Sequence, residues 1–360
     1  MVKLEEKNYV GCIVGGAIGD ALGAPIEFMN LSNILNKYGI SGVNDFVEFP
    51  DGKGQITDDT QMLLFTAEGL LRSLHRSHRN GLWGAYTVIC FQSYLRWLHT
   101  QQDWFGENAI NGRELNGWLI HEKFLYKRRA PGNTCLTSLR SAKSGTISKP
   151  INNSKGCGGI MRIAPVGLLF HDSPKQAFQI GAELAAMTHG HPSGYLSAGY
   201  LSALIAFLNN GIDLMQSIYQ SNEILKSYPS YEETYTAIQK ALDLHLVGQP
   251  DFYKLEKLGG GWVGEEALAI SIYCALSFKD DFEKAINLSI NHSGDTDSTG
   301  SITGNIIGLM LGEEMIPKRW INNLSNYDQI KQVASDLYTE VQGNGPDFYD
   351  EEWEFKYPGY

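Results

Sequence analysis

The chain has 360 residues, 43% of them hydrophobic and 19% charged, which is the composition of a globular protein with a large core. Its net charge of −11 disfavours nucleic acid as a general partner, because phosphate binding relies on clustered Lys and Arg. The short basic cluster at 127–129 fits a solvated face better than a binding stripe. Charged residues near the N-terminus and Asp20 interrupt the first apolar stretch, so we expect no secretory signal and no membrane span.

Cysteine usage and the lack of linkers bound the cellular setting and the domain number. The five cysteines are odd in number and form no CxxC pair, which indicates reduced thiols in a cytoplasm rather than a disulfide framework or a zinc site. No Pro/Ser/Gly-rich linker, low-complexity tract or solenoid repeat divides the chain. We therefore expect one domain over 1–360, located in the cytoplasm.

Helical periodicity dominates the sequence. Apolar residues recur at spacings of three and four, as amphipathic helices require, whereas alternating strand patterns with hairpin turns are scarce. The predicted helices lie at about 63–74, 177–187, 201–208, 268–276, 283–290, 300–311 and 329–341. The sequence thus predicts a mostly α-helical fold.

Glycine is abundant within or beside these helices. The segment 11–28 reads "GCIVGGAIGDALGAPIEF", and Gly300, Gly304 and Gly308 recur at fourfold spacing near the end of the chain. Glycine in a helix interior costs up to about 1 kcal/mol relative to alanine. Small residues at this spacing let two helices approach closely, so we expect close helix packing here.

Two acidic segments, far apart in the sequence, each stand just before a helix. The first, "TDDT", contains Thr57, Asp58 and Asp59, and the second, "DTDS", contains Asp295 to Ser298. Each is explained on its own by helix capping, because Asp and Thr are preferred N-caps and acidic residues suit the first turn of a helix. A cap needs only one carboxylate, however, and both segments carry two.

The doubled carboxylates indicate a cation site. Carboxylates that converge in a partly buried site repel one another and raise their pKa values unless a cation compensates. Carboxylate and hydroxyl oxygens without a His/Cys cluster suit Mg²⁺, Mn²⁺ or Ca²⁺ better than zinc. An EF-hand calcium loop starting at Asp295 is excluded, since its twelfth position is Ile306 instead of a bidentate Glu. For Asp20 and Glu27, functional and structural roles remain equally open.

The motifs, in their order along the chain, resemble those of the ADP-ribosylglycohydrolase family, which includes ADP-ribosylarginine hydrolases and enzymes that reactivate dinitrogenase reductase. The resemblance covers nearly the whole chain, through "GAIGDALGAPIEF", "TDDT", "PGNT", "GCGGIMRIAPVGL", "THGHPSGYLSA" and "HSGDTDSTGSITGNIIG". It implies an all-α, compact orthogonal helical bundle with a central cleft that holds two divalent cations, Mg²⁺ or Mn²⁺. A monomer is the family-like expectation.

The same resemblance implies roles for individual residues. The implied metal ligands are Thr57, Asp58, Asp59, Asp295, Asp297 and Ser298, and the implied catalytic residues are Glu27, Asp58 and Asp59. The implied substrate-binding residues are Gly132, Asn133, Thr134, Ser154, Gly156, Cys157, Gly158, His189 and Trp262. Plain turns for the glycines, core packing for Trp262 and a structural role for His189 are the alternatives. We interpret Cys157 as a lining residue, since no Cys/His dyad accompanies it, and His191 as structural.

One position departs from the family pattern. Some bacterial relatives carry an Asp, proposed as an acid/base, two residues before the glycine of "GNT", where this chain has Ala130. The chemistry then depends on Glu27, Asp58 and Asp59, or on a residue that the motifs do not align, such as Asp103 or Glu107.

The resemblance implies a metal-dependent hydrolase that releases ADP-ribose from a modified protein side chain, with arginine as the favoured linkage. Serine-linked ADP-ribose, O-acetyl-ADP-ribose and small-molecule conjugates stay open as substrates. A catalytically silent ADP-ribose-binding or structural protein is the alternative of a different class. A two-carboxylate glycosidase for sugars is the third, but no sugar-binding signature supports it.

Overall fold

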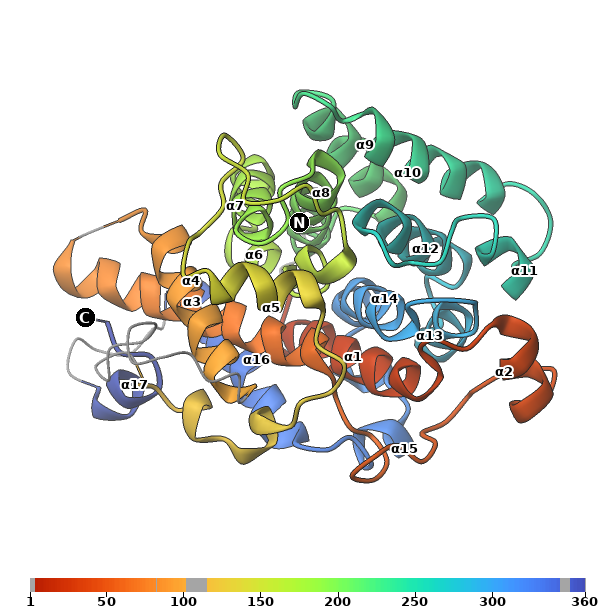
Figure 1. Ribbon diagram of the computed structural model, residues 1–360, viewed down its shortest axis with the longest axis horizontal. Helices are drawn as coiled ribbons and strands as arrows, with labels where there is room; N and C mark the ends of the chain where they lie inside the picture. Colours follow the sequence, from red (N-terminus) through yellow and green to blue (C-terminus); the bar gives the residue numbers. More distant parts are fainter. Residues whose placement is uncertain (1–3, 82, 102–114, 344–349, 360) are drawn as a thin grey trace.

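The computed structural model describes residues 4–81, 83–101, 115–343 and 350–359, and over these residues the fold is built from α-helices (Figure 1). The described residues contain seventeen α-helices and no β-sheet; their one isolated β-bridge joins Gly156 to Val263. The all-α fold class predicted from the sequence is confirmed.

The helices follow one another through the described parts of the chain. In the first half they are α1 (Glu6–Gly23), α2 (Leu31–Tyr38), α3 (Asp58–Asn80), α4 (Tyr86–Thr100), α5 (Asn133–Arg140), α6 (Ala164–Leu169) and α7 (Pro174–Ala186). In the second half they are α8 (Pro192–Asn209), α9 (Leu214–Leu225), α10 (Glu232–His245), α11 (Phe252–Leu255), α12 (Gly264–Ser277), α13 (Phe282–Ile290), α14 (Thr296–Leu311), α15 (Lys318–Ile321), α16 (Tyr327–Val341) and α17 (Glu351–Lys356).

Each predicted helical range falls on an observed helix, but the observed helices begin earlier. The reason is that their first turns are polar: α3 begins at Asp58 and α14 at Thr296, ahead of the apolar pattern. The apolar periodicity did not predict α4, whose run "YTVICFQSYLRW" is rich in β-branched and aromatic residues of modest helix propensity. Packing against α3 stabilises α4, whose own helix propensity is modest.

The antiparallel pair α1 and α14 is the most extensive helix contact in the protein and lies at its centre (Figure 1). Glycines face glycines along this contact, in the pairs Gly11 with Gly308, Gly15 with Gly304 and Gly19 with Gly300. A methyl group on Gly304 would lie 2.1 Å from the carbonyl oxygen of Gly15, and one on Gly308 would lie 1.9 Å from that of Gly11. The backbones therefore touch at a distance that only glycine permits.

Polar side chains fix the register of the same pair. Asn305 donates its amide N–H to the carbonyl oxygen of Cys12 at 2.8 Å, and the hydroxyl of Thr296 donates to that of Gly23 at 2.9 Å. Because the helices are antiparallel, the last turn of α1 lies beside the first turn of α14. Glu27, just after α1, is thereby brought next to the second acidic segment.

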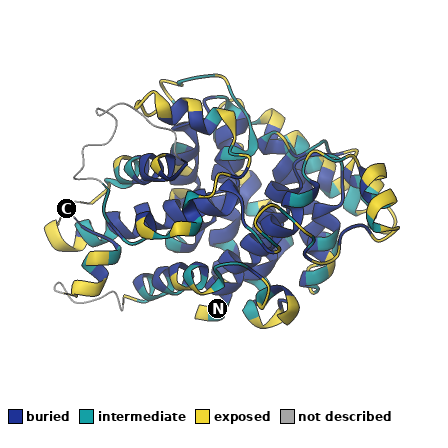
Figure 2. Cartoon of the chain, turned by 60° about the horizontal axis from the view of Figure 1, so that its bottom comes forward, coloured by how far each residue is buried: buried dark blue, intermediate teal, exposed yellow. Residues whose placement is uncertain are grey.

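Helix α1 is buried continuously from Asn8 to Gly23. Figure 2 shows that buried residues gather in the middle of the molecule and exposed residues lie toward its outside. With the following turn, Glu6–Ile26 is long and apolar enough to cross a membrane by length and composition, which the sequence analysis did not expect because it treated Asp20 as an interruption. In the structure, 94% of that apolar window is buried inside the protein, as in the core helix of a globular fold.

The glycine contact yields a stability prediction. Replacing Gly304 by Ala should lower the free energy of unfolding by about 2 kcal/mol or more, because overpacking against a rigid backbone exceeds the gain of up to about 1 kcal/mol in helix propensity. The measurement is urea denaturation followed by circular dichroism.

Gly132→Ala is the matched control. An added methyl group at Gly132 would meet no atom within 4 Å, and the backbone there has φ −56°, which any residue adopts. Equal stability of the two alanine variants would refute the close contact between α1 and α14.

Candidate functional site

A cavity of about 350 Å³ lies where the end of α1 meets the first turns of α3 and α14. Both acidic segments open into it, together with Glu27. Its lining includes Glu27, Asp58, Asp59, Asp295, Asp297 and Ser298. The two segments, more than 230 positions apart in the sequence, therefore contribute to one site.

Asp20 anchors the first acidic segment from the core. It is fully buried on α1, and its carboxylate accepts hydrogen bonds from the backbone N–H groups of Thr57 and Thr60 at 3.0 and 3.2 Å and from the Thr57 hydroxyl at 2.8 Å. Burial raises the pKa of Asp20 to about 6, against the lowering effect of these hydrogen bonds. Asp20 thus has a structural role: it ties the start of α3 to α1.

Thr57 caps α3, and its side chain accepts the N–H of Asp59 at 3.3 Å. Its hydroxyl proton is directed at Asp20, so Asp20 orients this side chain. Thr57 is not among the residues that line the cavity, and its part as a metal ligand stays a prediction.

Asp58 and Asp59 occupy the first turn of α3, where the positive end of the helix dipole favours carboxylates. Asp58 Oδ2 accepts the N–H of Gly132 at 3.3 Å, whereas Asp59 Oδ1 is buried without a hydrogen-bond partner. Burial, opposed by the bond from Gly132, raises the pKa of Asp58 to about 8. Burial and then the nearby charge of Asp58 raise the pKa of Asp59 well above its ordinary value.

The second acidic segment has the same construction at α14. Asp295 caps the helix, and its Oδ1 accepts the N–H of Ser298 at 3.3 Å. The same N–H donates to Asp297 Oδ1 at 3.0 Å. Burial, followed by the charges of Asp59 and Asp295, raises the pKa of Asp297 well above its ordinary value.

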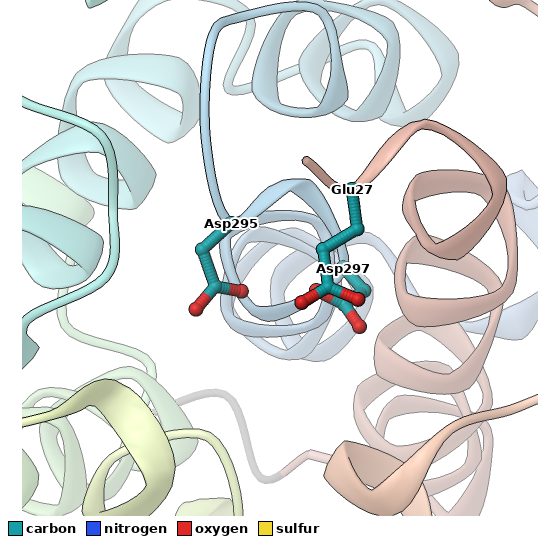
Figure 3. Close-up of side chains that lie close together, drawn as sticks. All are labelled: Glu27, Asp295 and Asp297. Carbon is teal, nitrogen blue, oxygen red and sulfur yellow. The ribbon is translucent and has the colours of Figure 1, made fainter. Parts of the chain in front are cut away.

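Glu27 completes the acidic group from the turn that follows α1 (Figure 3). One carboxylate oxygen from each of Glu27, Asp295 and Asp297 lies within 4.8 Å of the others. Burial, followed by the charges of Asp295 and Asp58, raises the pKa of Glu27 to about 9.

This acidic group fits a hard divalent cation. All its donors are carboxylate oxygens, with the hydroxyl of Ser298 beside them. The described residues provide no Lys or Arg in the cavity lining to balance the charge. Asp59 Oδ1 is buried without a hydrogen-bond partner among the protein atoms, as expected for an oxygen whose partner is a bound cation.

Arg129 corrects the expectation of a solvated basic face at 127–129. Its side chain is buried and donates to the carbonyl oxygen of Ile56 at 2.9 Å and to Gln55 Oε1 at 2.7 Å. It therefore holds the loop before Thr57 against the loop that presents Gly132. Lys127 and Arg128 are exposed, as expected for a surface cluster, and Lys127 lies 3.3 Å from Asp51.

Most of the residues predicted to contact substrate line the same cavity as the acidic group. The lining contains Gly132, Asn133, Thr134, Gly156, Cys157, Gly158, His189 and Trp262. Ser154 is not a lining residue; its hydroxyl lies 3.1 Å from that of Thr134 and accepts the N–H of Gly156 at 3.3 Å. The structure thus brings these positions together, while their individual roles stay predictions.

Cys157 lies beside the second acidic segment. Its thiol donates to Asp295 Oδ2 at 2.8 Å, and burial raises its pKa well above the ordinary value. A protonated thiol bonded to a carboxylate has little nucleophilic character, in line with the lining role expected for it.

Phe28 is a lining residue that the sequence analysis missed. Its ring is 70% exposed and stacks on Trp262 with centroids 5.2 Å apart, at the mouth of the cavity. Its φ of 69° is unusual for a non-glycine residue and turns the chain at this point. Nothing in the sequence indicates this conformation; only the neighbouring Glu27 points to the site.

The remaining candidate positions are placed as follows. Ala130 lines the cavity, so the position of the missing Asp does face the site. Asp103 and Glu107 lie outside the described residues. His191 caps α8 by accepting the N–H of Ser193 at 3.2 Å, which is the structural role expected for it.

A family model described as ADP-ribosylglycohydrolase matches residues 2–347. ADP-ribosylarginine hydrolase Tri1 of Serratia proteamaculans is 25% identical over 339 residues, covering 91% of this chain and 78% of the relative. ADP-ribosyl-[dinitrogen reductase] glycohydrolase of Rhodospirillum rubrum is 26% identical over 324 residues, covering 88% and 89%.

Two further comparisons agree with these. ADP-ribosylhydrolase ARH3 of Bos taurus is 23% identical over 374 residues, covering 93% of each chain. A solved structure titled "ADP-ribosylglycohydrolase-related protein complex" matches with a TM-score of 0.63 at 22% identity, covering 93% of this chain and 98% of that one. At this identity the structural likeness supports the fold. The family resemblance seen in the motifs is confirmed.

The raised pKa values yield a prediction for the metal-free protein. The pKa values of Asp58 and Glu27 rise from ordinary values of 3.8 and 4.5 to about 8 and 9, so the folded state binds more protons than the unfolded chain within this range. Their contribution to stability is complete below about pH 4 and is lost as the pH rises through 8 and 9. In EDTA the melting temperature should therefore fall from pH 5 to pH 9.

Mg²⁺ or Mn²⁺ should oppose this fall, because a bound cation compensates the ionised carboxylates. The matched variant is Glu27→Gln, which should flatten the pH dependence in EDTA. The electrostatic account of the site would be contradicted if the melting temperature in EDTA stayed constant from pH 5 to pH 9 and did not respond to Glu27→Gln.

Proposed function

Because the chain belongs to the ADP-ribosylglycohydrolase family, we propose that it is a metal-dependent hydrolase that releases ADP-ribose from modified arginine side chains of proteins. The observation that carries the proposal is the convergence of the two acidic segments and Glu27 on one cavity, which the loops at 132–134 and 156–158 also line. A cavity lined by carboxylates and by glycine-rich backbone suits a substrate that carries both a ribose and a diphosphate.

Arginine is the linkage we propose, for two reasons. The motifs "GCGGIMR" and "DTDS" are those of the arginine branch, and one relative is named an ADP-ribosylarginine hydrolase. A carboxylate-rich cavity also suits a cationic guanidino leaving group and the positive charge that develops on the ribose as the glycosidic bond breaks.

Two divalent cations, Mg²⁺ or Mn²⁺, are part of the proposal. The residues that would hold them are Asp58, Asp59, Asp295, Asp297 and Ser298, together with Thr57, whose side chain is oriented by Asp20. Bound there, the cations supply positive charge that positions ribose hydroxyls and lowers the pKa of water.

The carboxyl groups of the chain then have distinct tasks. Asp58 uses Oδ2 to accept the N–H of Gly132, which leaves Oδ1 to accept a proton from the attacking water. Glu27, half-buried beside Asp295 and Asp297, is the carboxyl group that we assign to donate a proton to the departing guanidino nitrogen. The water oxygen bonds to the ribose carbon, the carbon–nitrogen bond breaks, and the two proton transfers balance.

The proposal includes a monomer acting in the cytoplasm. The cytoplasm is supported by the cysteines, since all five are free in the structure and four of them are buried, as is usual for proteins of a reducing compartment; the monomer is the family-like expectation.

The direct test follows ADP-ribose release from an arginine-ADP-ribosylated protein with Mg²⁺, with Mn²⁺ and with EDTA. Release should require the cation. Asp58→Asn should lower kcat at least a hundredfold, because it removes a general base that contributes about 10²–10⁴-fold. Asp45→Asn, at an exposed carboxylate away from the cavity, is the matched control and should leave the rate unchanged.

The substrate panel includes serine-linked ADP-ribose and O-acetyl-ADP-ribose. Release from one of these but not from arginine would keep the hydrolase and change the linkage. Tight ADP-ribose binding without release from any conjugate would contradict the proposed hydrolase activity and favour a catalytically silent binding protein.

A further inference from the structure

Arg162 is a charged side chain in the fully buried core. Its guanidinium lies 4.2 Å above the ring of Tyr94, and no carboxylate is within ion-pair distance of it among the described residues. Its best hydrogen bond runs from Nη2 to the hydroxyl oxygen of Thr188, at 2.8 Å. Burial of a cation is costly unless its donors are satisfied, and Nε has no partner among the described residues, so the short bond to Thr188 is a main contact that orients this guanidinium.

Thr188, held by Arg162, in turn contacts the next residue, His189. Its hydroxyl oxygen also lies 2.8 Å from Nδ1 of His189, whereas the carbonyl oxygen of Ala185 is farther away, at 3.4 Å. Since the oxygen already accepts a hydrogen bond from Arg162, its own proton is best donated to the nearer acceptor, Nδ1. The charge of Arg162 favours the same arrangement, because it attracts the lone pair of Nδ1 and repels a proton there.

The opposite edge of the His189 ring faces the cavity. No hydrogen-bond partner for Nε2 occurs in the described part of the chain, and His189 is a lining residue. Gly156 and Gly158 border this edge: a methyl group on Gly156 would lie 3.4 Å from Nε2, and one on Gly158 3.3 Å away. Gly156 has φ −55° and ψ 156°, which any residue adopts, so space over the imidazole explains the glycine better than backbone freedom.

We propose that Arg162 and Thr188 are positioning residues that hold His189 as a neutral imidazole whose Nε2–H donates to an oxygen of the ADP-ribose moiety. The ligand rests on the proposed function; the tautomer rests on the hydrogen bonds alone. Burial, aided by Arg162, lowers the pKa of His189 to about 3, so the donor stays neutral and unchanged across the physiological range.

The first test is the tautomer itself, by ¹⁵N NMR of histidine-labelled protein, with His189→Gln to assign the signal. His189 should show an unprotonated Nδ1 and a protonated Nε2. Thr188→Val and Arg162→Met should each produce a mixture of tautomers, and Thr188→Ser should restore the single form. Thr303→Val, at a buried hydroxyl without a partner, is the control for folding.

The second test is ADP-ribose binding by calorimetry in Mg²⁺. Gln can place an amide N–H where Nε2 stands, whereas Asn reaches only the Nδ1 position. His189→Gln should therefore bind within about threefold of wild type, and His189→Asn about tenfold to a hundredfold more weakly, as for a lost hydrogen bond to a charged group. Gly156→Ala, whose methyl group covers Nε2 without overlap, should weaken binding about as much as His189→Asn.

The outcomes separate the two proposals. A protonated Nδ1 in wild type, or tighter binding by His189→Asn than by His189→Gln, overturns this inference and leaves the proposed hydrolase untouched. A wild-type protein that shows the expected tautomer but binds no ADP-ribose overturns the proposed function and, with it, the ligand assigned to Nε2–H.

Discussion

The contact between α1 and α14 is the constraint on which the site depends. Four positions on each helix meet in an antiparallel register, and at three of them glycine meets glycine. Hydrogen bonds from Asn305 and Thr296 to backbone carbonyl groups of α1 fix this register. A slip of one turn, about 5.4 Å, would carry Glu27 away from the second acidic segment.

A second connection from α1 reaches the first acidic segment. Asp20 binds the first turn of α3 through four hydrogen-bond donors of Thr57 and Thr60, and Arg129 secures the preceding loop. One helix thus uses glycines to hold α14 and a carboxylate to hold α3. The positive ends of both helices then point at the same group of carboxylates, which lessens their repulsion before any cation binds.

Much of the site was predictable because its chemistry is local in sequence. Doubled carboxylates at two helix starts indicated a cation site, and the family motifs joined the segments. The register of α1 against α14 was not predictable, since glycine spacing shows that a helix packs closely without identifying its partner. Arg129 and Phe28 were missed for a similar reason: the burial of one and the positive φ of the other are set by the tertiary fold.

The central claim is that both acidic segments build one cation site, and a Mn²⁺ titration followed by electron paramagnetic resonance tests it most directly. Wild type, Asp59→Asn, Asp297→Asn and the double variant would be compared. The account predicts that either single variant weakens the same Mn²⁺ binding and that the double variant loses little more, because the ligands act together. Full Mn²⁺ binding in either single variant, or strictly additive losses from two independent sites, would contradict it.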